Sequence, residues 1–393
     1  MNILMFNYEY PPVGGGGGVV HALIAEELAR RHRVVVITSR VGQLAKQEDV
    51  NGVEVHRVPV IARSDPAAAS LASMLSYPPG AWVAAARLFR RERFDVVNSH
   101  FAVPTGPGSL PVAKLMHMRH VISVHGGDVY DPSKRLSPHR FALLRYTVTQ
   151  VLRRSDVVIA QSTNTRDNVY RYYGYRGPIE MVPLGIRIPS VVPATRAALG
   201  LPTGVFLLVT VGRLVRRKAV DELLRILARP GFDGLHLAVI GTGPELLPLQ
   251  SLAQELGLGS RVHFLGRVSE EAKWQILTAS DAYVSTTMHE GFGLVYLEGM
   301  ACGLPVVTYD HGGQTDFLAD GVTGRLLPAG NADAMASALL ALAGDPAAAR
   351  RIGAANVARA EGHRIETCAA AYERILQGGT AQGRPLPAVA AAP

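Results

Sequence analysis

The sequence is poor in cysteine, and the motifs typical of metal-dependent enzymes are missing from it. Cys302 and Cys368 are the only two cysteines among 393 residues. Two are too few for a disulfide framework, so we interpret both as core residues in a reducing cytosol. No Asp-x-Asp pair and no His/Asp cluster with ligand spacing occurs in the sequence. We therefore expect neither a bound metal nor a cofactor.

A complete dinucleotide-binding fingerprint is also missing. Neither half of the chain has Gly-x-Gly-x-x-Gly after its first predicted strand with an acidic residue about twenty positions further on. Gly241-Thr-Gly-Pro-Glu245 resembles half of this fingerprint but lacks the third glycine. A nicotinamide-dependent dehydrogenase is therefore disfavoured.

No uninterrupted hydrophobic segment is long enough to cross a membrane. The longest uncharged stretch, residues 66–86, contains Pro78-Pro79-Gly80 and several serines, so we expect a loop and part of a surface helix there. The first predicted strand begins at Asn2 without preceding basic residues. We therefore expect no secretory signal and a cytoplasmic protein.

Basic residues outnumber acidic ones by 40 to 32, giving a formal charge of +8. No aromatic-interleaved basic stripe accompanies this charge, so nucleic acid is not an expected partner. The basic clusters fit a solvated surface, phosphorylated acceptors, or a peripheral contact with anionic lipid at the inner membrane face. They comprise Arg87, Arg90, Arg91, Arg93, Lys134, Arg135, Arg140, Arg145, Arg153 and Arg154.

What is abundant is an alternation of short apolar runs and amphipathic segments. This alternation predicts an α/β fold with doubly wound parallel sheets that helices cover on both faces. Predicted helices include residues 19–31 and 141–154. The predicted strands are residues 2–7, 33–38, 53–58, 95–99, 120–124, 156–160, 205–211, 235–240, 262–265, 282–284 and 305–308.

The length and a proline-rich stretch after Pro183 indicate two domains. We predict an N-terminal Rossmann-like domain, a linker, a C-terminal Rossmann-like domain, a last helix that packs back on the first domain, and a flexible tail. Their predicted bounds are residues 1–185, 186–203, 204–362, 363–377 and 378–393.

The densest group of chemically committed residues lies between Glu290 and Glu298. A predicted strand leads into Glu290-Gly-Phe-Gly, and a helical pattern opens at Leu294. Gly291 and Gly293 allow a tight turn in which backbone amides can face an anion at the helix start. Glu298, near the first turn of this helix, can accept hydrogen bonds from the hydroxyl groups of a ribose. The alternative is an ordinary capped helix.

Two cations follow the first strand of the second half, within Gly212-Arg213-Leu-Val-Arg-Arg-Lys218. Arg213 and Lys218 would bracket the space at the strand end, where fixed positive charge can neutralise a diphosphate leaving group. The alternative is two unrelated surface charges.

Two motifs of the first half also lie at predicted strand ends. Five glycines, residues 14–18, precede a helix and can close over phosphate or admit an acceptor; the alternative is a flexible connector. His125-Gly-Gly-Asp128 follows another strand. His125 could hydrogen-bond a sugar hydroxyl, with Asp128 near the acceptor, although a lone histidine is more often structural.

Together these motifs resemble the retaining glycosyltransferases of family 4, the group 1 glycosyltransferases with the two-Rossmann GT-B fold. The resemblance covers nearly the whole chain. Its most specific part is Glu290-x7-Glu298, followed by Gly299-Met-Ala-Cys-Gly-Leu-Pro-Val-Val307.

The resemblance implies a role for each motif. Gly212, Arg213 and Lys218 would hold the diphosphate of a nucleotide-sugar, with the backbone amides of Gly291, Phe292, Gly293 and Leu294. Glu290 would bind sugar hydroxyls, Glu298 the ribose and Val268 the base through its backbone. His125 would contact the transferred sugar, and Gly15, Gly16, Gly17 and Asp128 would face the acceptor.

Two departures from the family pattern stand out. Ala219 occupies the position after the lysine where the family usually has glycine, and the glycine run is longer than usual. No carboxylate resembles a nucleophile for the opposite face of the sugar. We therefore expect same-face attack, in which the leaving phosphate accepts the proton of the acceptor.

Several alternatives stay open at this stage. A nucleotide-sugar epimerase or a phosphorylase could share the fold, as could a non-catalytic nucleotide-sugar-binding protein. UDP- and GDP-hexoses both fit as the sugar donor. The acceptor, whose site we expect in the loops 59–80 and 130–140, could be lipid-linked, a glycan or a small molecule of polysaccharide or glycolipid biosynthesis.

Overall fold

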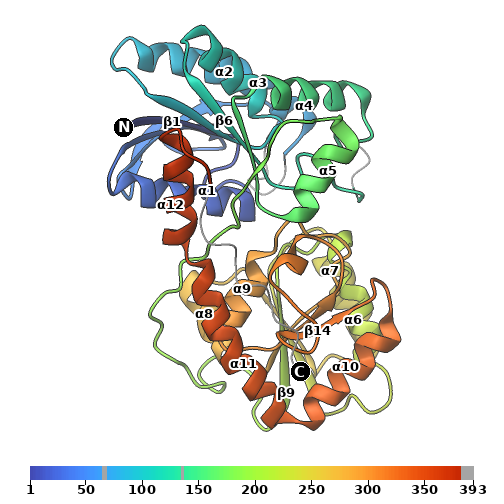
Figure 1. Ribbon diagram of the computed structural model, residues 1–393. Helices are drawn as coiled ribbons and strands as arrows, with labels where there is room; N and C mark the ends of the chain where they lie inside the picture. Colours follow the sequence, from blue (N-terminus) through green and yellow to red (C-terminus); the bar gives the residue numbers. More distant parts are fainter. Residues whose placement is uncertain (64–68, 134–136, 382–393) are drawn as a thin grey trace. The chain divides into compact units, whose positions relative to one another are not determined.

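The computed structural model describes residues 1–63, 69–133 and 137–381, which form two compact units (Figure 1). The first unit comprises Met1–Arg187 and the segment that begins at Arg364, and the second comprises Ile188–His363. Each unit is an α/β domain built on its own sheet. The predicted fold class of two doubly wound parallel-sheet domains is confirmed.

The sheet of the first unit has the strand order β3-β4-β2-β1-β5-β6-β7-β8 and is parallel except for the β3–β4 pair. Helices α2 to α5 cover one face, and α1 and α12 pack together on the other (Figure 1). The strands are β1 Asn2–Asn7, β2 Arg33–Arg40, β3 Gln47–Val50, β4 Val53–Pro59, β5 Val96–His100, β6 Arg119–Val124, β7 Val157–Ala160 and β8 Glu180–Met181. The helices are α1 Gly16–Ala29, α2 Leu71–Phe89, α3 Gly106–Leu115, α4 Ala142–Arg154, α5 Thr163–Tyr173 and α12 Ile365–Leu376.

The sheet of the second unit is fully parallel, in the order β11-β10-β9-β12-β13-β14. Its strands are β9 Phe206–Val211, β10 Leu235–Ile240, β11 Val262–Gly266, β12 Ala282–Ser285, β13 Val306–Tyr309 and β14 Gly324–Leu327. Its helices are α6 Val220–Leu227, α7 Leu246–Glu255, α8 Glu270–Thr278, α9 Leu294–Ala301, α10 Ala332–Gly344 and α11 Pro346–Ala360. Short 3₁₀ turns are η1 Arg216–Lys218, η2 Gly313–Asp316 and η3 Glu361–His363.

The central strands are almost entirely apolar because both faces of each sheet are covered. Ile3, Leu4 and Met5 of β1 are fully buried, and Leu207, Leu208 and Val209 of β9 occupy the same position in the second unit. Catalytic or binding groups can therefore lie only where strands end and loops begin. The carboxyl ends of parallel strands are where open α/β sheets bind ligands.

The helical part of the segment 66–86, which was predicted as a loop and part of a surface helix, includes both prolines. From Leu71 onward it belongs to one helix, α2, that continues through Pro78 and Pro79; residues 64–68 lie outside the described part. Tertiary packing outweighs the two prolines, because the Tyr77 hydroxyl donates to Ile37 O (2.8 Å). Gly80 packs closely on Val58, with no room for a larger side chain.

Of the predicted linker, residues 186–203, the first two residues belong to the first unit and residues 188–203 to the second. The Arg196 guanidinium donates to the carbonyls of Val205 and Ala279 and to the Asp281 carboxylate. These bonds fix the stretch to the edge of that unit. Within the described ranges, no helix combines the length and apolarity needed to cross a bilayer.

Candidate functional site

Loops at the carboxyl ends of β9 and β12 are joined by a set of backbone and side-chain hydrogen bonds. The Arg217 guanidinium donates to His289 O (2.8 Å), and Met288 N donates to Arg217 O (2.9 Å). The Thr286 hydroxyl donates to Ala219 O (2.8 Å). The two loops that carry Lys218 and Glu290 therefore behave as one rigid surface.

Lys218 and Glu290 form an ion pair in that surface, with 2.6 Å between Lys218 Nζ and Glu290 Oε2. Both side chains are largely buried. Burial raises the pKa of the Glu290 carboxyl, but the Lys218 ammonium and the Arg217 guanidinium outweigh burial and lower this pKa below its ordinary value. A carboxylate and an ammonium thus stand together at the strand ends.

Glycines make room for this pair. A Cβ on Gly212 would lie 3.7 Å from Lys218 Nζ, and its φ of +154° is rare for other residues. A Cβ on Gly312 would lie 2.6 Å from Glu290 O. Gly293, with φ +94°, precedes the first residue of α9, and a Cβ there would lie 2.4 Å from the Tyr296 ring. The backbone can therefore approach a ligand at the start of α9.

Glu298 lies on α9 and pairs with a lysine that the sequence analysis did not single out. Lys273 Nζ, on α8, is 2.8 Å from Glu298 Oε1 and 2.8 Å from Glu270 Oε2. Burial lowers the pKa of the Lys273 ammonium, but its two carboxylate partners outweigh burial and raise this pKa. Lys273 therefore holds the Glu298 carboxylate in place.

Three more of the predicted residues of the second unit lie in loops that follow its strands. Arg213 is exposed just after β9, and Val268 is partly buried just after β11. Phe292 is buried against Phe317, with ring centroids 5.1 Å apart. Ala219 has φ +46° and ψ +39°, the left-handed conformation that glycine adopts most easily. This explains why the family pattern has glycine at that position.

In the first unit, His125 and Asp128 lie in one tight turn after β6. Asp128 Oδ1 accepts from His125 N (2.8 Å), and Asp128 Oδ2 accepts from Ala102 N (2.6 Å). Asp128 is therefore a buried turn-stabilising residue, and its two oxygens already serve backbone amides. His125 is partly buried, its Nδ1 atom fully so, and burial lowers the pKa of its ring to about 3.

The glycine loop divides into a loop part and a helical part. Gly15 caps α1, which begins at Gly16. Gly15 and Gly16 have open space where a Cβ would stand, whereas a Cβ on Gly17 would lie 2.3 Å from the Phe101 ring. Gly17 is thus required for packing, and Gly15 and Gly16 are the glycines with free space beside them.

The predicted residues fall in both units: Gly15 to Gly17, His125 and Asp128 in the first, and all others in the second. Sequence reasoning missed Arg217, Lys273 and Gly312. Gly312 could have been found, because it follows the strand β13 as Gly212 follows β9. Lys273 could not, because nothing in a helical surface lysine predicts a buried partner.

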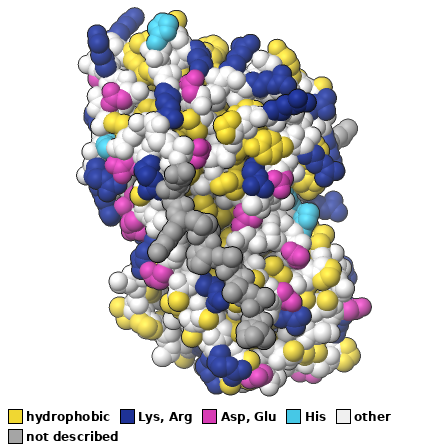
Figure 2. Space-filling model, viewed as in Figure 1, with side chains coloured by type: hydrophobic (Ala, Val, Ile, Leu, Met, Phe, Trp, Pro, Cys, Tyr) yellow, Lys and Arg dark blue, Asp and Glu magenta, His cyan; other side chains and the backbone are white. Residues whose placement is uncertain are grey.

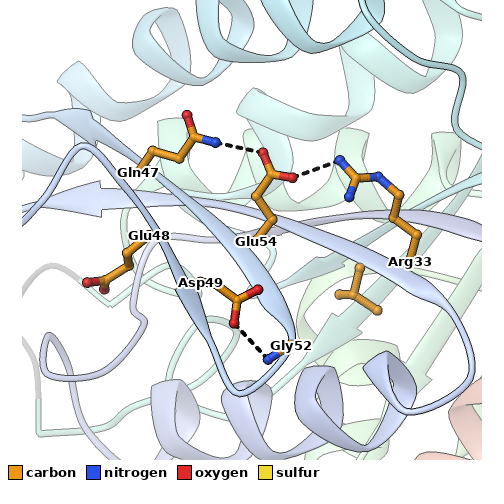
Figure 3. A pocket seen from close by; sticks show the side chains of 7 residues that line it. Arg33, Gln47, Glu48, Asp49, Gly52 and Glu54 are labelled. Atoms are coloured by element: carbon orange, nitrogen blue, oxygen red, sulfur yellow. Dashed lines mark hydrogen bonds and ion pairs between the residues drawn. The ribbon is translucent and has the colours of Figure 1, made fainter.

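A hollow on the first unit lies apart from these residues (Figure 3). It is lined from β2, β3 and β4, and its polar groups already pair with one another. Arg33 and Gln47 donate to Glu54, and Gly52 N donates to Asp49. We assign it no ligand. Within the described ranges no group of three or more His, Cys, Asp or Glu side chains could hold a metal ion.

Two protein families match the two halves of the chain. Residues 14–188 match the family described as Glycosyltransferase Family 4, and residues 191–359 match Glycosyl transferases group 1. A D-inositol 3-phosphate glycosyltransferase from Nocardia farcinica is 30% identical over 329 residues, which are 75% of this chain and 71% of the relative.

Solved structures share the architecture. Sucrose-phosphate synthase from Thermosynechococcus elongatus has a TM-score of 0.82 at 21% identity, over 96% of this chain and 98% of that one. The Anabaena protein HepE in complex with UDP-glucose has a TM-score of 0.75 at 21% identity, over 96% and 99%. At these identities the likeness concerns the fold, which is that of two-domain sugar-transferring enzymes.

Proposed function

Because the chain belongs to the group 1 glycosyl transferases of family 4 and has the GT-B fold, we propose that it moves a hexosyl group from a UDP- or GDP-hexose to a hydroxyl group with retention of configuration. The observation that carries this proposal is the cluster in the second unit. A buried ion pair of Lys218 and Glu290 stands beside Gly212 and the start of α9.

This cluster supplies what a nucleotide diphosphate needs. Lys218 and Arg213 provide positive charge, and the first amides of α9 add the positive end of a helix dipole. Glu290 holds the Lys218 ammonium in place and can accept hydrogen bonds from sugar hydroxyls. Glu298, held by Lys273, is the acceptor for the ribose.

In the proposed reaction the bond between the anomeric carbon and the phosphate oxygen breaks, and the acceptor oxygen bonds to the same face of that carbon. The acceptor proton passes to the leaving phosphate, which departs as part of the nucleoside diphosphate. Arg213, Lys218 and the α9 amides stabilise the charge that develops on this phosphate. Since these groups supply positive charge, we expect turnover to continue in the presence of a chelator.

The residues of the chain indicate the identity of the acceptor less directly than that of the donor. The relative from Nocardia farcinica is named for D-inositol 3-phosphate, so this small phosphorylated acceptor is the first to assay, followed by lipid-linked and glycan acceptors. Of the segments 59–80 and 130–140, where we place the acceptor, residues 64–68 and 134–136 lie outside the described part, and residues 71–80 belong to helix α2 and not to a loop.

The decisive experiment is a thermal-shift screen of UDP, GDP and ADP with their sugars, because a ligand that binds only the folded protein raises its melting temperature. One nucleotide should raise it, and Lys218→Ala and Glu298→Ala should abolish or greatly reduce the rise. Lys46→Ala and Glu271→Ala, at exposed positions, are the matched controls. A rise that survives both site substitutions would rule out this assignment.

Product analysis separates transfer from the rival activities. With a nucleotide-sugar and no acceptor, a transferase yields at most slow hydrolysis, whereas an epimerase yields a new nucleotide-sugar. Phosphate-dependent formation of a sugar phosphate from a glycan would instead identify a phosphorylase. A protein that binds the nucleotide-sugar and turns over no acceptor is the non-catalytic alternative.

A second proposal concerns location: the first unit contacts an anionic membrane surface. Exposed apolar side chains on α2, among them Trp82 and Val83, lie on the same helix as exposed Arg87. On α4, exposed Phe141, Leu143 and Tyr146 accompany Arg145, Arg153 and Arg154. Figure 2 shows Lys and Arg side chains beside hydrophobic ones over this unit, a composition that suits a lipid interface.

Replacing Arg87, Arg90 and Arg91 together by Ser should weaken sedimentation with vesicles of anionic phospholipid, because each basic side chain near such a surface contributes about 1 kcal/mol. The triple substitution of Arg225, Arg350 and Arg351 in the second unit removes the same charge and serves as control. Equal sedimentation of both variants and the unaltered chain would contradict a membrane contact by this surface.

A further inference from the structure

A chain of hydrogen bonds inside the first unit ends on the His125 ring, and a backbone carbonyl fixes its direction at the other end. The Asn98 amide donates from Nδ2 to Val121 O (3.2 Å). A carbonyl can only accept, so the nitrogen of this amide faces Val121 and its oxygen faces away. That oxygen, Oδ1, lies 3.0 Å from His100 Nε2.

The fixed orientation of the Asn98 amide also determines which nitrogen donates and which accepts in both imidazole rings. Because Asn98 Oδ1 can only accept, His100 carries its proton on Nε2, and in a neutral ring Nδ1 is then the acceptor. His100 Nδ1 lies 2.8 Å from His125 Nε2, so His125 must donate from Nε2. This leaves His125 Nδ1 unprotonated, with a free lone pair.

The argument requires that both rings are neutral, and their surroundings keep them so. Burial, together with the neighbouring rings of His21 and His125, lowers the pKa of His100 well below its ordinary value. Burial alone lowers the pKa of His125 to about 3. The rings packed on His100 are His21, with centroids 4.4 Å apart, and Tyr372, at 5.6 Å.

Within the described ranges the lone pair on His125 Nδ1 has no hydrogen-bond partner, although the atom is buried. Leaving a buried acceptor unpaired costs folding free energy. Phe101 packs against this ring, with centroids 4.8 Å apart, and its own backbone is in the left-handed region at φ +71°. A bulky residue in that region is strained, and such strain is concentrated at functional sites.

We propose that Asn98 and His100 are positioning residues that hold His125 as its Nε2–H tautomer, so that Nδ1 accepts a hydrogen bond from one hydroxyl of the transferred sugar. The Phe101 side chain moves aside to admit it. This inference rests on the proposed function and on the family resemblance, which implies that His125 contacts the transferred sugar. The proposal defines a substrate class: sugars in which the carbon that faces His125 Nδ1 carries a free hydroxyl group. A deoxy carbon or a carboxylate oxygen could not donate a hydrogen bond there.

The first test reads the tautomer directly and requires no activity. Long-range proton–nitrogen correlation spectra of the full chain, with ¹⁵N-labelled imidazoles, distinguish a protonated from an unprotonated ring nitrogen. His125→Gln identifies the His125 signals among those of 13 histidines. We expect an unprotonated Nδ1 and a protonated Nε2. A protonated Nδ1 in the unaltered protein overturns the proposal.

The second test removes the relay. In His100→Phe and in Asn98→Leu, the spectra should show His125 as a mixture of tautomers, and kcat/KM should fall about 10-fold or more. His21→Phe, a ring of the same cluster without a bond in the relay, is the control and should change neither. In His100→Gln the new amide can accept a hydrogen bond through its oxygen and donate one through its nitrogen, so this variant should restore the Nε2–H tautomer of His125. An unchanged tautomer in His100→Phe overturns the proposal.

The third test concerns the sugar. The unaltered enzyme should prefer the nucleotide-sugar found in the screen over one of its monodeoxy analogues by about 10- to 100-fold, and His100→Phe should reduce this preference. An undiminished preference in His100→Phe contradicts the positioning role. If no nucleotide-sugar is used at all, the proposed function fails, and the tautomer spectra still decide whether the relay exists.

Discussion

Single residues decide how the candidate site of the second unit is held together. Lys218 and Glu290 could be predicted as neighbours, because each follows a strand and parallel strands end at the same edge of a sheet. Lys273 could not be predicted, because its buried contact with Glu298 depends on how α8 packs beside α9. A helical pattern fixes which face is apolar, and it leaves open which neighbouring helix contributes the partner of a buried charge.

Lys273→Met should destabilise the second unit by about 3 kcal/mol at pH 7, because it leaves the Glu298 carboxylate buried without its cation. Burial already raises the pKa of this carboxyl. A raised folded pKa favours folding below the unfolded value near 4.3 and opposes it above the folded value. The loss should therefore shrink as pH falls from 7 to 5, and urea unfolding followed by Trp274 fluorescence measures it.

Glu270→Gln is the matched control, since Glu270 is the exposed partner of the same lysine, with 82% of its side chain accessible. Exposed ion pairs contribute about 0–1 kcal/mol, so this variant should unfold almost as the unaltered protein does. Equal losses in both variants would contradict a special role for the Lys273–Glu298 contact.

At the scale of helices and strands, local patterns locate elements well and miss what tertiary packing imposes. The bounds predicted for β1 and β10 agree with the structure, because each is a mainly apolar run, interrupted in β10 only by His236, that polar residues or glycine bound. The short strands β3 and β14 were not predicted, since Gln47–Val50 is polar and Gly324–Leu327 begins with glycine and arginine. Helix α2 continues through two prolines because the sheet beneath it holds Tyr77.

The start of α9 offers a test at this scale. Gly293→Ala puts a Cβ where φ is +94° and where the Tyr296 ring would be 2.4 Å away. The chain can accommodate it only by shifting the first turn of α9, so we expect destabilisation by about 1–3 kcal/mol and a loss of nucleotide binding beyond tenfold. Calorimetric titration with the nucleotide found in the screen measures the second effect.

Gly344→Ala is the control for this substitution. Gly344 is the last residue of α10, and nothing lies within 4 Å of a Cβ built there. Replacing it should leave binding unchanged and alter stability by less than about 1 kcal/mol. If both variants bind the nucleotide as the unaltered protein does, the start of α9 is not part of the site.

At the scale of the whole molecule, the two units differ in how strongly burial lowers the pKa of their histidines, although the second unit also buries His289 and His363. In the first unit burial is the main cause that lowers the pKa of His21, His100, His120 and His125, to about 3 for His21, His120 and His125. The histidines with lowered pKa in the second unit, His236 and His263, are only partly buried. The two units should therefore respond differently to acid.

A histidine whose folded pKa lies below its unfolded value of about 6.5 favours folding above 6.5, and this contribution is lost as pH falls from 6.5 toward 3. Each such group costs up to about 1.4 kcal/mol per pH unit in that window. We therefore expect the first unit to unfold at a higher pH than the second. Trp82 lies in the first unit and Trp274 in the second, so Trp274→Phe and Trp82→Phe proteins report each unit by fluorescence.

His21→Leu should move the transition of the first unit to lower pH, because it removes one buried base that has no hydrogen-bond partner in the described structure. The transition reported by Trp274 should stay where it was. Coincident transitions below pH 4 would instead indicate that carboxylates govern acid unfolding of both units.

The path of the chain through the first unit has a practical consequence for dissecting the protein. Ile365 N donates to Ile186 O (2.9 Å), so the point where the polypeptide leaves this unit and the point where it returns are immediate neighbours. In the gene, the second unit is therefore an insertion between two positions that are adjacent in the folded first unit. A short bridge in place of residues 188–363 would therefore close the remaining sheet and helices into one continuous gene product, and the excised cassette could be exchanged for that of another family member.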